Sequence, residues 1–284
     1  MNKRLILLGF LLIQCSIISF SQIKNDAGSA NKIDECAKVF TGLECDVSLF
    51  SCPLNYAIAS GSYPCVKQIA DREGVPYIQT KTYPPAAIPI INAVLSGRLE
   101  IVNLLYGYNS DLEIKDVVFE KTPLRWASTM IQPPYTTDSA YLQIMDFLIK
   151  KGADIDAIDK WGETALIENA RLGRYEYVKL LIDNGANLNI TNGKGATALM
   201  TSTDNQKILT LLARANVMIR DQNGRTAIFY AIERCQPNKF KMLLARNRDL
   251  LKMPDRDGYL PSEFANKLGL QNNCPEIAVQ LNAK

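Results

Sequence analysis

The chain has 284 residues, and 47% of them are hydrophobic, which is enough to bury a sizeable core and too many for a disordered tail. The formal net charge is +3; without Lys3 and Arg4, which belong to the leader described next, 30 basic residues face 29 acidic ones, and this argues against nucleic acid as a partner. Histidine is absent, which excludes Ser-His-Asp and Cys-His catalytic sites, histidine general bases and histidine metal ligands.

Residues 1–21 have the features of a secretory signal. Lys3 and Arg4 precede the apolar stretch LILLGFLLIQCSIISF, and Ser19 and Ser21 place small residues where cleavage would leave Gln22 as the new terminus. The apolar run is interrupted and shorter than the ~20 residues of a membrane-spanning helix, so we expect no membrane insertion after cleavage. Export, most simply to a bacterial periplasm, is therefore predicted.

Secretion and lipid anchoring are the alternative destinations. A lipid anchor would use Cys15, but Gln14 fits poorly the small residue that such processing prefers, and the apolar stretch continues beyond Cys15. Residues 22–50 fit no repeat; they predict a flexible polar leader followed by an N-terminal cap.

Six cysteines follow the leader, an even number that suggests disulfides in an oxidising compartment. They are Cys36, Cys45, Cys52, Cys65, Cys235 and Cys274. Clustering favours a Cys235–Cys274 bridge that joins the last repeat to its neighbour, whereas the first four permit three pairings. A zinc site made of those four is disfavoured because they contain no C-x2-C pair, and free buried thiols are the remaining alternative.

The sequences GADIDAIDKWGETAL and GANLNITNGKGATAL begin 33 residues apart, at Gly152 and Gly185. A Thr-x-Leu or Thr-x-Ile beat, each starting a predicted short helix, occurs at Thr122, Thr164, Thr197 and Thr226. A second helix follows each, with apolar residues at i, i+3 and i+4, and polar turns with glycine (DKWG, NGKG, DQNG, DRDG) separate the copies. Such short helices are marginal alone, so stacked copies must bury one another's apolar faces.

This pattern resembles the ankyrin repeat family, whose T-P-L-H-x-A-A, L-L, G-A-D and D-x-x-G elements occur in register from about residue 118 to 258. The resemblance implies an all-α solenoid of helix-turn-helix units over residues 51–284, with about seven units including caps. The expected units are 51–82, 83–116, 117–159 with an insert, 160–192, 193–222, 223–255 and 256–284 as the C-terminal cap.

Two departures from the family are visible. The family histidine, which bonds between neighbouring loops, is replaced in every unit, by Asn55, Ile91, Arg125, Ile167, Met200 and Phe229. We expect apolar packing to hold the turns instead. The insert MIQPPYTTDSAY lengthens the third unit, and the short spacing from Thr197 to Thr226 predicts a clipped inter-helix turn at STDNQ.

Several motifs are better explained by the repeat than by chemistry. GKGATA at Gly193 imitates a phosphate-binding loop but lies at a hairpin turn. The acids of DIDAID lack the glycine and the closing Glu of a calcium loop, so no metal and no cofactor is expected. Trp161 lies in an exposed turn and is interpreted as a contact residue, with packing on the adjacent hairpin as the alternative, whereas Trp126 is expected to be core.

The resemblance implies a monomeric, non-catalytic module that binds an unknown protein partner along a concave strip of turns and first helices. The positions that match are Lys160, Trp161, Glu163, Arg171, Gln222, Asn223, Arg225, Arg256, Asp257 and Tyr259. An inhibitor or immunity protein is one role; the alternatives are a scaffold of an envelope or oxidative-stress enzyme, or a secreted effector. A carboxylate hydrolase built on the insert near Pro133–Tyr141 is disfavoured, because that segment has only Asp138 as an acid.

Overall fold

The computed structural model describes residues 52–73, 88–130, 138–269 and 274–282. The predicted signal, the leader with Cys36 and Cys45, and most of the insert lie outside these ranges. Within them the chain forms α-helices, short 3-10 segments and turns, and no strand. The predicted all-α fold is therefore confirmed.

The described helices form seven successive pairs. The first members are α3 (Cys52–Ser60), α6 (Pro89–Leu95), α8 (Pro123–Thr129), α10 (Ala165–Leu172), α12 (Ala198–Thr201), α14 (Ala227–Glu233) and α16 (Pro261–Lys267). The second members are α4 (Tyr63–Glu73), α7 (Leu99–Gly107), α9 (Asp138–Lys150), α11 (Tyr175–Asp183), α13 (Gln206–Leu211), α15 (Pro237–Arg246) and α18 (Pro275–Asn282). The 3-10 segments η3 (Leu212–Arg214) and η4 (Arg248–Lys252) follow α13 and α15.

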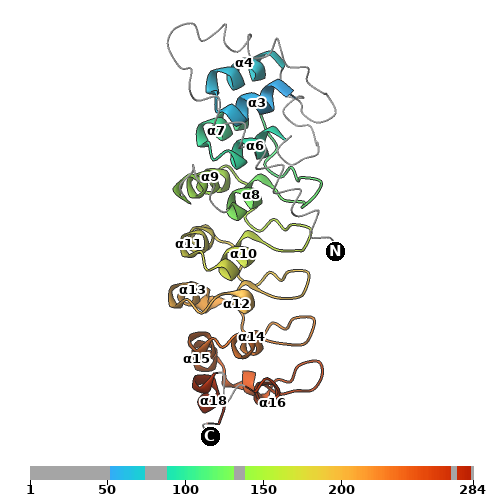
Figure 1. The fold of residues 1–284 in the computed structure, drawn as a ribbon, viewed down its shortest axis with the longest axis vertical. Helices are drawn as coiled ribbons and strands as arrows, with labels where there is room; N and C mark the ends of the chain where they lie inside the picture. Colours follow the sequence, from blue (N-terminus) through green and yellow to red (C-terminus); the bar gives the residue numbers. More distant parts are fainter. Residues whose placement is uncertain (1–51, 74–87, 131–137, 270–273, 283–284) are drawn as a thin grey trace.

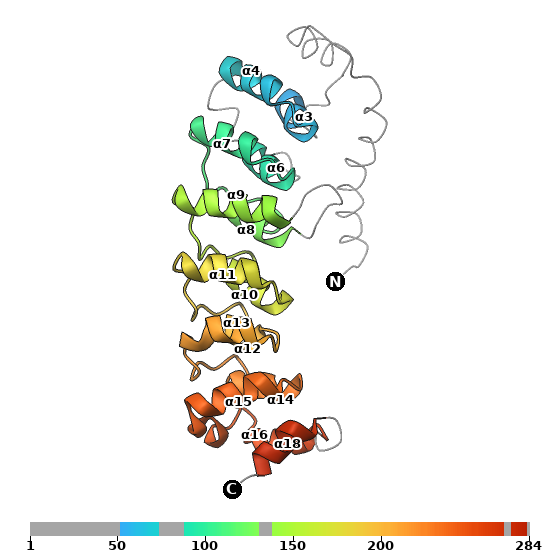
Figure 2. The same ribbon diagram turned by 90° about the vertical axis from the view of Figure 1, so that its left-hand side faces the viewer.

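The pairs stack into an elongated solenoid with two columns of helices (Figures 1 and 2). First helices contact first helices of the next pair, as α10 contacts α12, and second helices do the same, as α13 contacts α15. One continuous apolar core runs between the columns, from Leu54 in α3 to Ile277 in α18. Each pair thus covers the apolar face of its neighbour, as the repeat predicts.

The threonine of the beat starts the helix as an N-cap. The hydroxyl oxygens of Thr122, Thr164 and Thr197 accept hydrogen bonds, of 3.2 to 3.3 Å, from the backbone N–H three residues later. Such a cap typically contributes ~1 kcal/mol by satisfying an otherwise unpaired helix donor. Thr226 begins α14 without such a bond.

The fifth pair differs from our expectation. The turn from α12 to α13 comprises residues 202–205, whereas residues 173–174 suffice between α10 and α11, so the prediction of a clipped turn is wrong. The helix itself is shortened, since α12 has four residues and α10 has eight. Donors from the next unit cap its end: Arg234 donates to the Thr201 carbonyl at 2.9 Å, and Gln236 and Lys239 donate to Ser202.

A disulfide joins Cys235, in the turn between α14 and α15, to Cys274, directly before α18, with 5.7 Å between the Cα atoms. This confirms the predicted bridge, and it ties the last helix pair to the one before. Cys65 is also disulfide-bonded. The pairing among the first four cysteines stays a prediction.

Candidate partner-binding surface

Five turns project from the side of the first-helix column (Figure 1). We call them turn A (residues 116–121), turn B (159–163), turn C (192–196), turn D (221–225) and turn E (255–259). Turns B to E contain the D-x-x-G or N-x-x-G sequences, and each precedes the first helix of its pair.

The first residue of each turn holds the turn together. In turn B the Asp159 Oδ1 accepts hydrogen bonds from the backbone N–H groups of Trp161 and Glu163, at 2.9 and 3.0 Å. The same pair of bonds recurs in turns C, D and E. There the Oδ1 atoms of Asn192, Asp221 and Asp255 accept hydrogen bonds from the backbone N–H groups two and four residues later. The expectation that apolar packing holds the turns is therefore wrong, because these side-chain oxygens do so.

Backbone hydrogen bonds then link each turn to the next. They run from Lys160 N to Phe119 O (3.1 Å), from Gly193 N to Trp161 O (2.8 Å), from Gln222 N to Lys194 O (3.0 Å) and from Arg256 N to Asn223 O (2.8 Å). In turn C the N–H groups of residues 193 to 196 all donate within the protein. The amides of the GKGA segment are thus engaged within the protein rather than turned toward a phosphate, which supports the interpretation of GKGATA as a turn.

The second carboxylate oxygen of Asp159, in turn B, binds the residue at the family histidine position. Arg125, at the family histidine position, donates to Asp159 Oδ2 at 2.8 Å and to Glu168 at 3.1 Å. The Arg125 and Asp159 side chains are only 1% and 2% exposed. A buried ion pair thus joins α8 to the next turn.

Turns D and E use other partners for that oxygen. Asp221 Oδ2 accepts a hydrogen bond from the Tyr230 hydroxyl at 2.8 Å, and burial together with this bond raises the pKa of the phenol. Arg225 lies 3.6 Å from Asp255 Oδ2 and stacks 4.7 Å above the centre of the Phe264 ring. Arg225, predicted to face a partner, is therefore engaged within the stack.

The remaining predicted residues fall into two groups. In the first, Trp161 is 46% exposed, Lys160 and Arg171 are exposed, and Glu163 pairs with Arg171 at 3.4 Å. In the second, around turns D and E, all five residues are exposed or half-buried: Gln222, Asn223, Arg256 and Asp257 are exposed, and Tyr259 lies half-buried with Lys267 4.3 Å from its ring centre. Their role in binding stays a prediction.

Turn A adds apolar residues that the sequence reasoning missed. Val117 is 56% exposed, and Ile158, directly before turn B, is 44% exposed. The centre of the Phe119 ring lies 5.7 Å from that of Trp126 and 6.0 Å from that of Trp161. Trp161 therefore packs on a neighbouring turn and is still partly exposed to solvent, which agrees with both interpretations of this residue. Trp126 is buried, as predicted, and its indole N–H donates to Asp116 at 3.0 Å. The signal was the run VVF at a position that is polar in the other turns.

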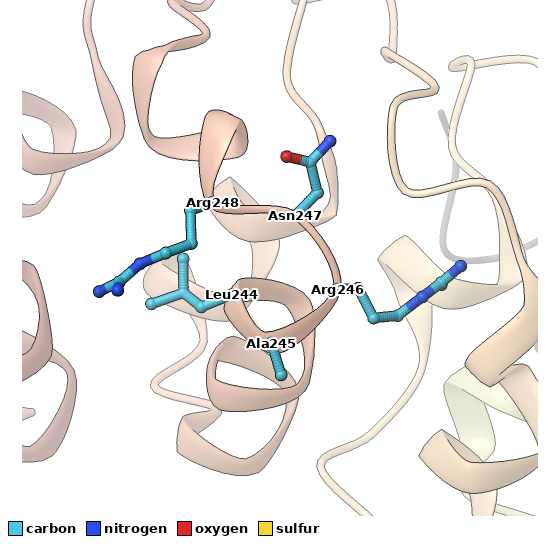
Figure 3. A pocket seen from close by; sticks show the side chains of 5 residues that line it. All are labelled: Leu244, Ala245, Arg246, Asn247 and Arg248. Atoms are coloured by element: carbon cyan, nitrogen blue, oxygen red, sulfur yellow. The ribbon is translucent and has the colours of Figure 1, made fainter.

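The described part of the chain offers little for catalysis. It contains no cluster of acids or cysteines that could hold a metal ion, and none of its helices has the length and apolar character needed to cross a membrane. A hollow of about 560 Å³ is lined by residues 244–248, and the side chains of Arg246 and Arg248 point in opposite directions there (Figure 3). None of its lining residues is an acid or a nucleophile, so it resembles no carboxylate site.

The sequence model of the family 'Ankyrin repeats (3 copies)' matches residues 90–192, 135–221 and 184–254 of the chain, which together cover more than half of it. The chain belongs to the ankyrin repeat family. A crystal structure of an ankyrin repeat domain from Acinetobacter baumannii shares its fold, with a TM-score of 0.58 and 26% identity, over 68% of this chain and 96% of that one.

Curated relatives share the repeats over part of their length. Human inversin is 27% identical over 61% of this ankyrin repeat chain, which spans only 16% of inversin. Palmitoyltransferase AKR1 of Lachancea kluyveri is 26% identical over 67% of the chain and 24% of its own length. Because the ankyrin repeat is generally a non-catalytic interaction module, the shared part indicates binding to a protein.

Proposed function

We propose that this ankyrin repeat chain is an exported, non-catalytic module that binds a partner protein through turns A to E and the adjacent first helices. The observation that carries the proposal is the exposed apolar group of Val117 in turn A, Trp161 in turn B and Ile158 directly before turn B. Aromatic residues such as Trp161 dominate the binding energy of many interfaces, and exposed large apolar side chains have a solvation cost that a partner would remove.

The size of the surface fits this role. A standard interface buries about 1,600 Å² in total and uses roughly 20–30 residues on each side. Five turns in one row, each offering several side chains, supply that number. Because the row is held by backbone bonds and Asx bonds, its shape is set before binding, which lowers the entropic cost of association.

Export is part of the proposal. Its support is the signal-like sequence of residues 1–21, which lies outside the described residues, together with the Cys235–Cys274 bridge. Disulfides persist in oxidising compartments, with the periplasm as the proposed location. N-terminal sequencing of the mature protein from a periplasmic extract would test this, with Gln22 expected as the first residue.

Affinity capture of the tagged mature chain from its native envelope fraction tests the binding surface. Trp161→Ala should lose the captured partner while retaining its melting temperature. Tyr63→Ala, which removes an exposed aromatic on α4 away from the turns, should retain the partner. Arg225 is unsuitable as a test position because it is half-buried and contacts Asp255 and the Phe264 ring, so its removal would also change the packing of the stack. Equal capture by all three proteins, or steady turnover of a substrate by the purified chain, would contradict the proposal.

Two roles can use such a surface, and the captured partner separates them. An inhibitor or immunity protein should abolish the partner's enzymatic activity at equimolar ratio. A scaffold for an envelope or oxidative-stress enzyme should leave that activity intact and raise the enzyme's thermal stability.

A further inference from the structure

Three lysines, Lys115, Lys121 and Lys160, lie in or directly before turns A and B. The Lys160 ammonium lies 4.7 Å from the Trp161 ring centre and 4.8 Å from that of Phe119, and donates to the Val118 carbonyl at 2.6 Å. Lys121 lies 5.3 Å from the Trp126 ring centre and 6.0 Å from that of Phe119. Lys115 donates to the Ile158 carbonyl at 2.9 Å.

These ammonium groups have no carboxylate within 4.0 Å among the residues that the structure describes. The acids of turns A and B and the adjacent Glu168 are already engaged, apart from the exposed Glu120 of turn A. Asp159 and Glu168 bind Arg125, and Glu163 binds Arg171. Asp116 accepts hydrogen bonds from three backbone N–H groups of its own turn and from Trp126. The three ammonium groups therefore contact carbonyls and aromatic rings, and no described carboxylate lies in direct contact with them.

Burial adds to this imbalance. Desolvation lowers the pKa of the Lys121 ammonium, and the charge of Arg125 acts in the same direction; the charges of Glu168, Asp159 and Asp116 only partly oppose these effects. A further carboxylate placed beside Lys121 would favour its charged form.

Turns C, D and E lack this combination. All of their residues are described, and none is an exposed large hydrophobic. Their tips carry Gly193 and Lys194, Gln222 and Asn223, or Arg256 and Asp257. The apolar group with its lysines is therefore a local feature of turns A and B rather than a property of the whole row.

We propose, building on the proposed function, that the partner segment bound at turns A and B presents a carboxylate side chain directly beside an apolar one. The apolar side chain packs on Trp161 and Val117, and the carboxylate reaches Lys121 and Lys160. Charge complementarity of this kind mainly sets the choice of partner and the association rate.

A selection from random dodecapeptides displayed on phage tests the pairing and does not require the partner itself. The bait is the full mature chain, compared with Trp161→Ala, Lys160→Glu and Lys241→Glu. Lys241 is the matched control, because it is an exposed lysine on α15, a second helix that lies outside turns A to E. Enriched peptides are then measured individually by fluorescence anisotropy at low and high salt, and the fold of each variant is checked by circular dichroism.

The expected result is enrichment of Asp or Glu next to Phe, Leu, Trp or Tyr. These peptides should bind Lys160→Glu about tenfold more weakly and bind Lys241→Glu as they bind the wild type, and their binding should weaken with salt. Purely apolar peptides that are lost with Trp161→Ala but unaffected by Lys160→Glu would overturn this inference and leave the proposed function standing. Binding that survives Trp161→Ala would overturn both, and a selection that enriches no peptide would overturn the inference.

Discussion

Gly162 occupies a point where two turns nearly touch. Its φ is +72°, and a Cβ atom there would lie 2.8 Å from the backbone nitrogen of Gly193 in turn C. Gly258 in turn E has a similar φ of +89° but open space around the same position. The two glycines therefore separate the cost of a left-handed residue from the cost of a steric clash.

Gly258→Ala should destabilise the fold by about 1 kcal/mol, the cost of a left-handed backbone for a residue with a Cβ. Gly162→Ala should cost at least about twice as much, because turns B and C must also move apart. Urea unfolding of both variants measures the difference. Equal free energies of unfolding would mean that the row of turns is loose enough to absorb a methyl group.

Arg125 is the residue whose environment is hardest to guess from sequence. Arg125→Met should destabilise the chain by about 3 kcal/mol, because it leaves Asp159 buried without its cation. Asp159→Asn keeps the Oδ1 acceptor, as Asn192 does in turn C, so the double variant should recover part of that loss. A double-mutant cycle in urea tests the coupling, and strictly additive effects would show that the ion pair contributes no interaction energy.

The residues that hold the turns were visible in the sequence but were given the wrong role. DKWG, NGKG, DQNG and DRDG each start with an Asp or Asn, the residues that bond their own backbone two positions on. Because the family histidine is absent, the sequence favours apolar packing as the interaction that holds the turns. A buried Arg125 could not be foreseen, since arginine is rarely buried without a partner and its partner is 34 residues away.

At the scale of elements, the Thr-x-Leu beat located the first helices because a cap and an apolar stripe are both local signals. Turn A could not be predicted from this pattern because it lacks the D-x-x-G sequence. Its Glu120, with φ +53°, adopts the left-handed conformation that glycine has in the other turns. The shortness of α12 could not be predicted either. The side-chain donors that bind its last carbonyls come from the next unit, more than 30 residues later.

Lys239 connects α15 to the end of α12, and it should make the contact between these two helices depend on pH. It is fully buried against the end of α12, and burial, with Arg234 nearby, lowers its pKa to about 7 despite the charge of Asp204. Between pH 7 and 10 the unfolded chain then binds more protons at this lysine than the folded chain, so stability should rise with pH in that window.

Lys239→Met should flatten that rise by up to about 1 kcal/mol per pH unit. Lys241→Met, an exposed lysine on the same helix, is the control and should keep the wild-type slope. Free energies of unfolding in urea at pH 6, 7, 8 and 9 provide the comparison. Parallel curves for wild type and Lys239→Met would show that the lysine stays protonated in the folded chain.

At the scale of the whole molecule, the main contacts of each described helix pair are with the pairs next to it, so a perturbation at one end should stay there. The Cys235–Cys274 bridge closes a separation of 39 residues, which corresponds to about 4 kcal/mol of loop entropy in the unfolded chain. It is also placed at a left-handed position, since Cys235 has a φ of +48° where the equivalent turn after α6 has Gly97 at +69°.

Cys235→Gly with Cys274→Ser removes the bridge and leaves a residue that suits that backbone, so that only the cross-link is lost. Hydrogen exchange should then lose protection in α16 and α18, which a single neighbouring pair covers, while α10 to α13 keep theirs. The wild-type chain in the same buffer is the reference. Protection lost along the whole stack would mean that the units unfold as one cooperative body, and unchanged protection in α18 would mean that packing of Ile277 alone holds the last helix.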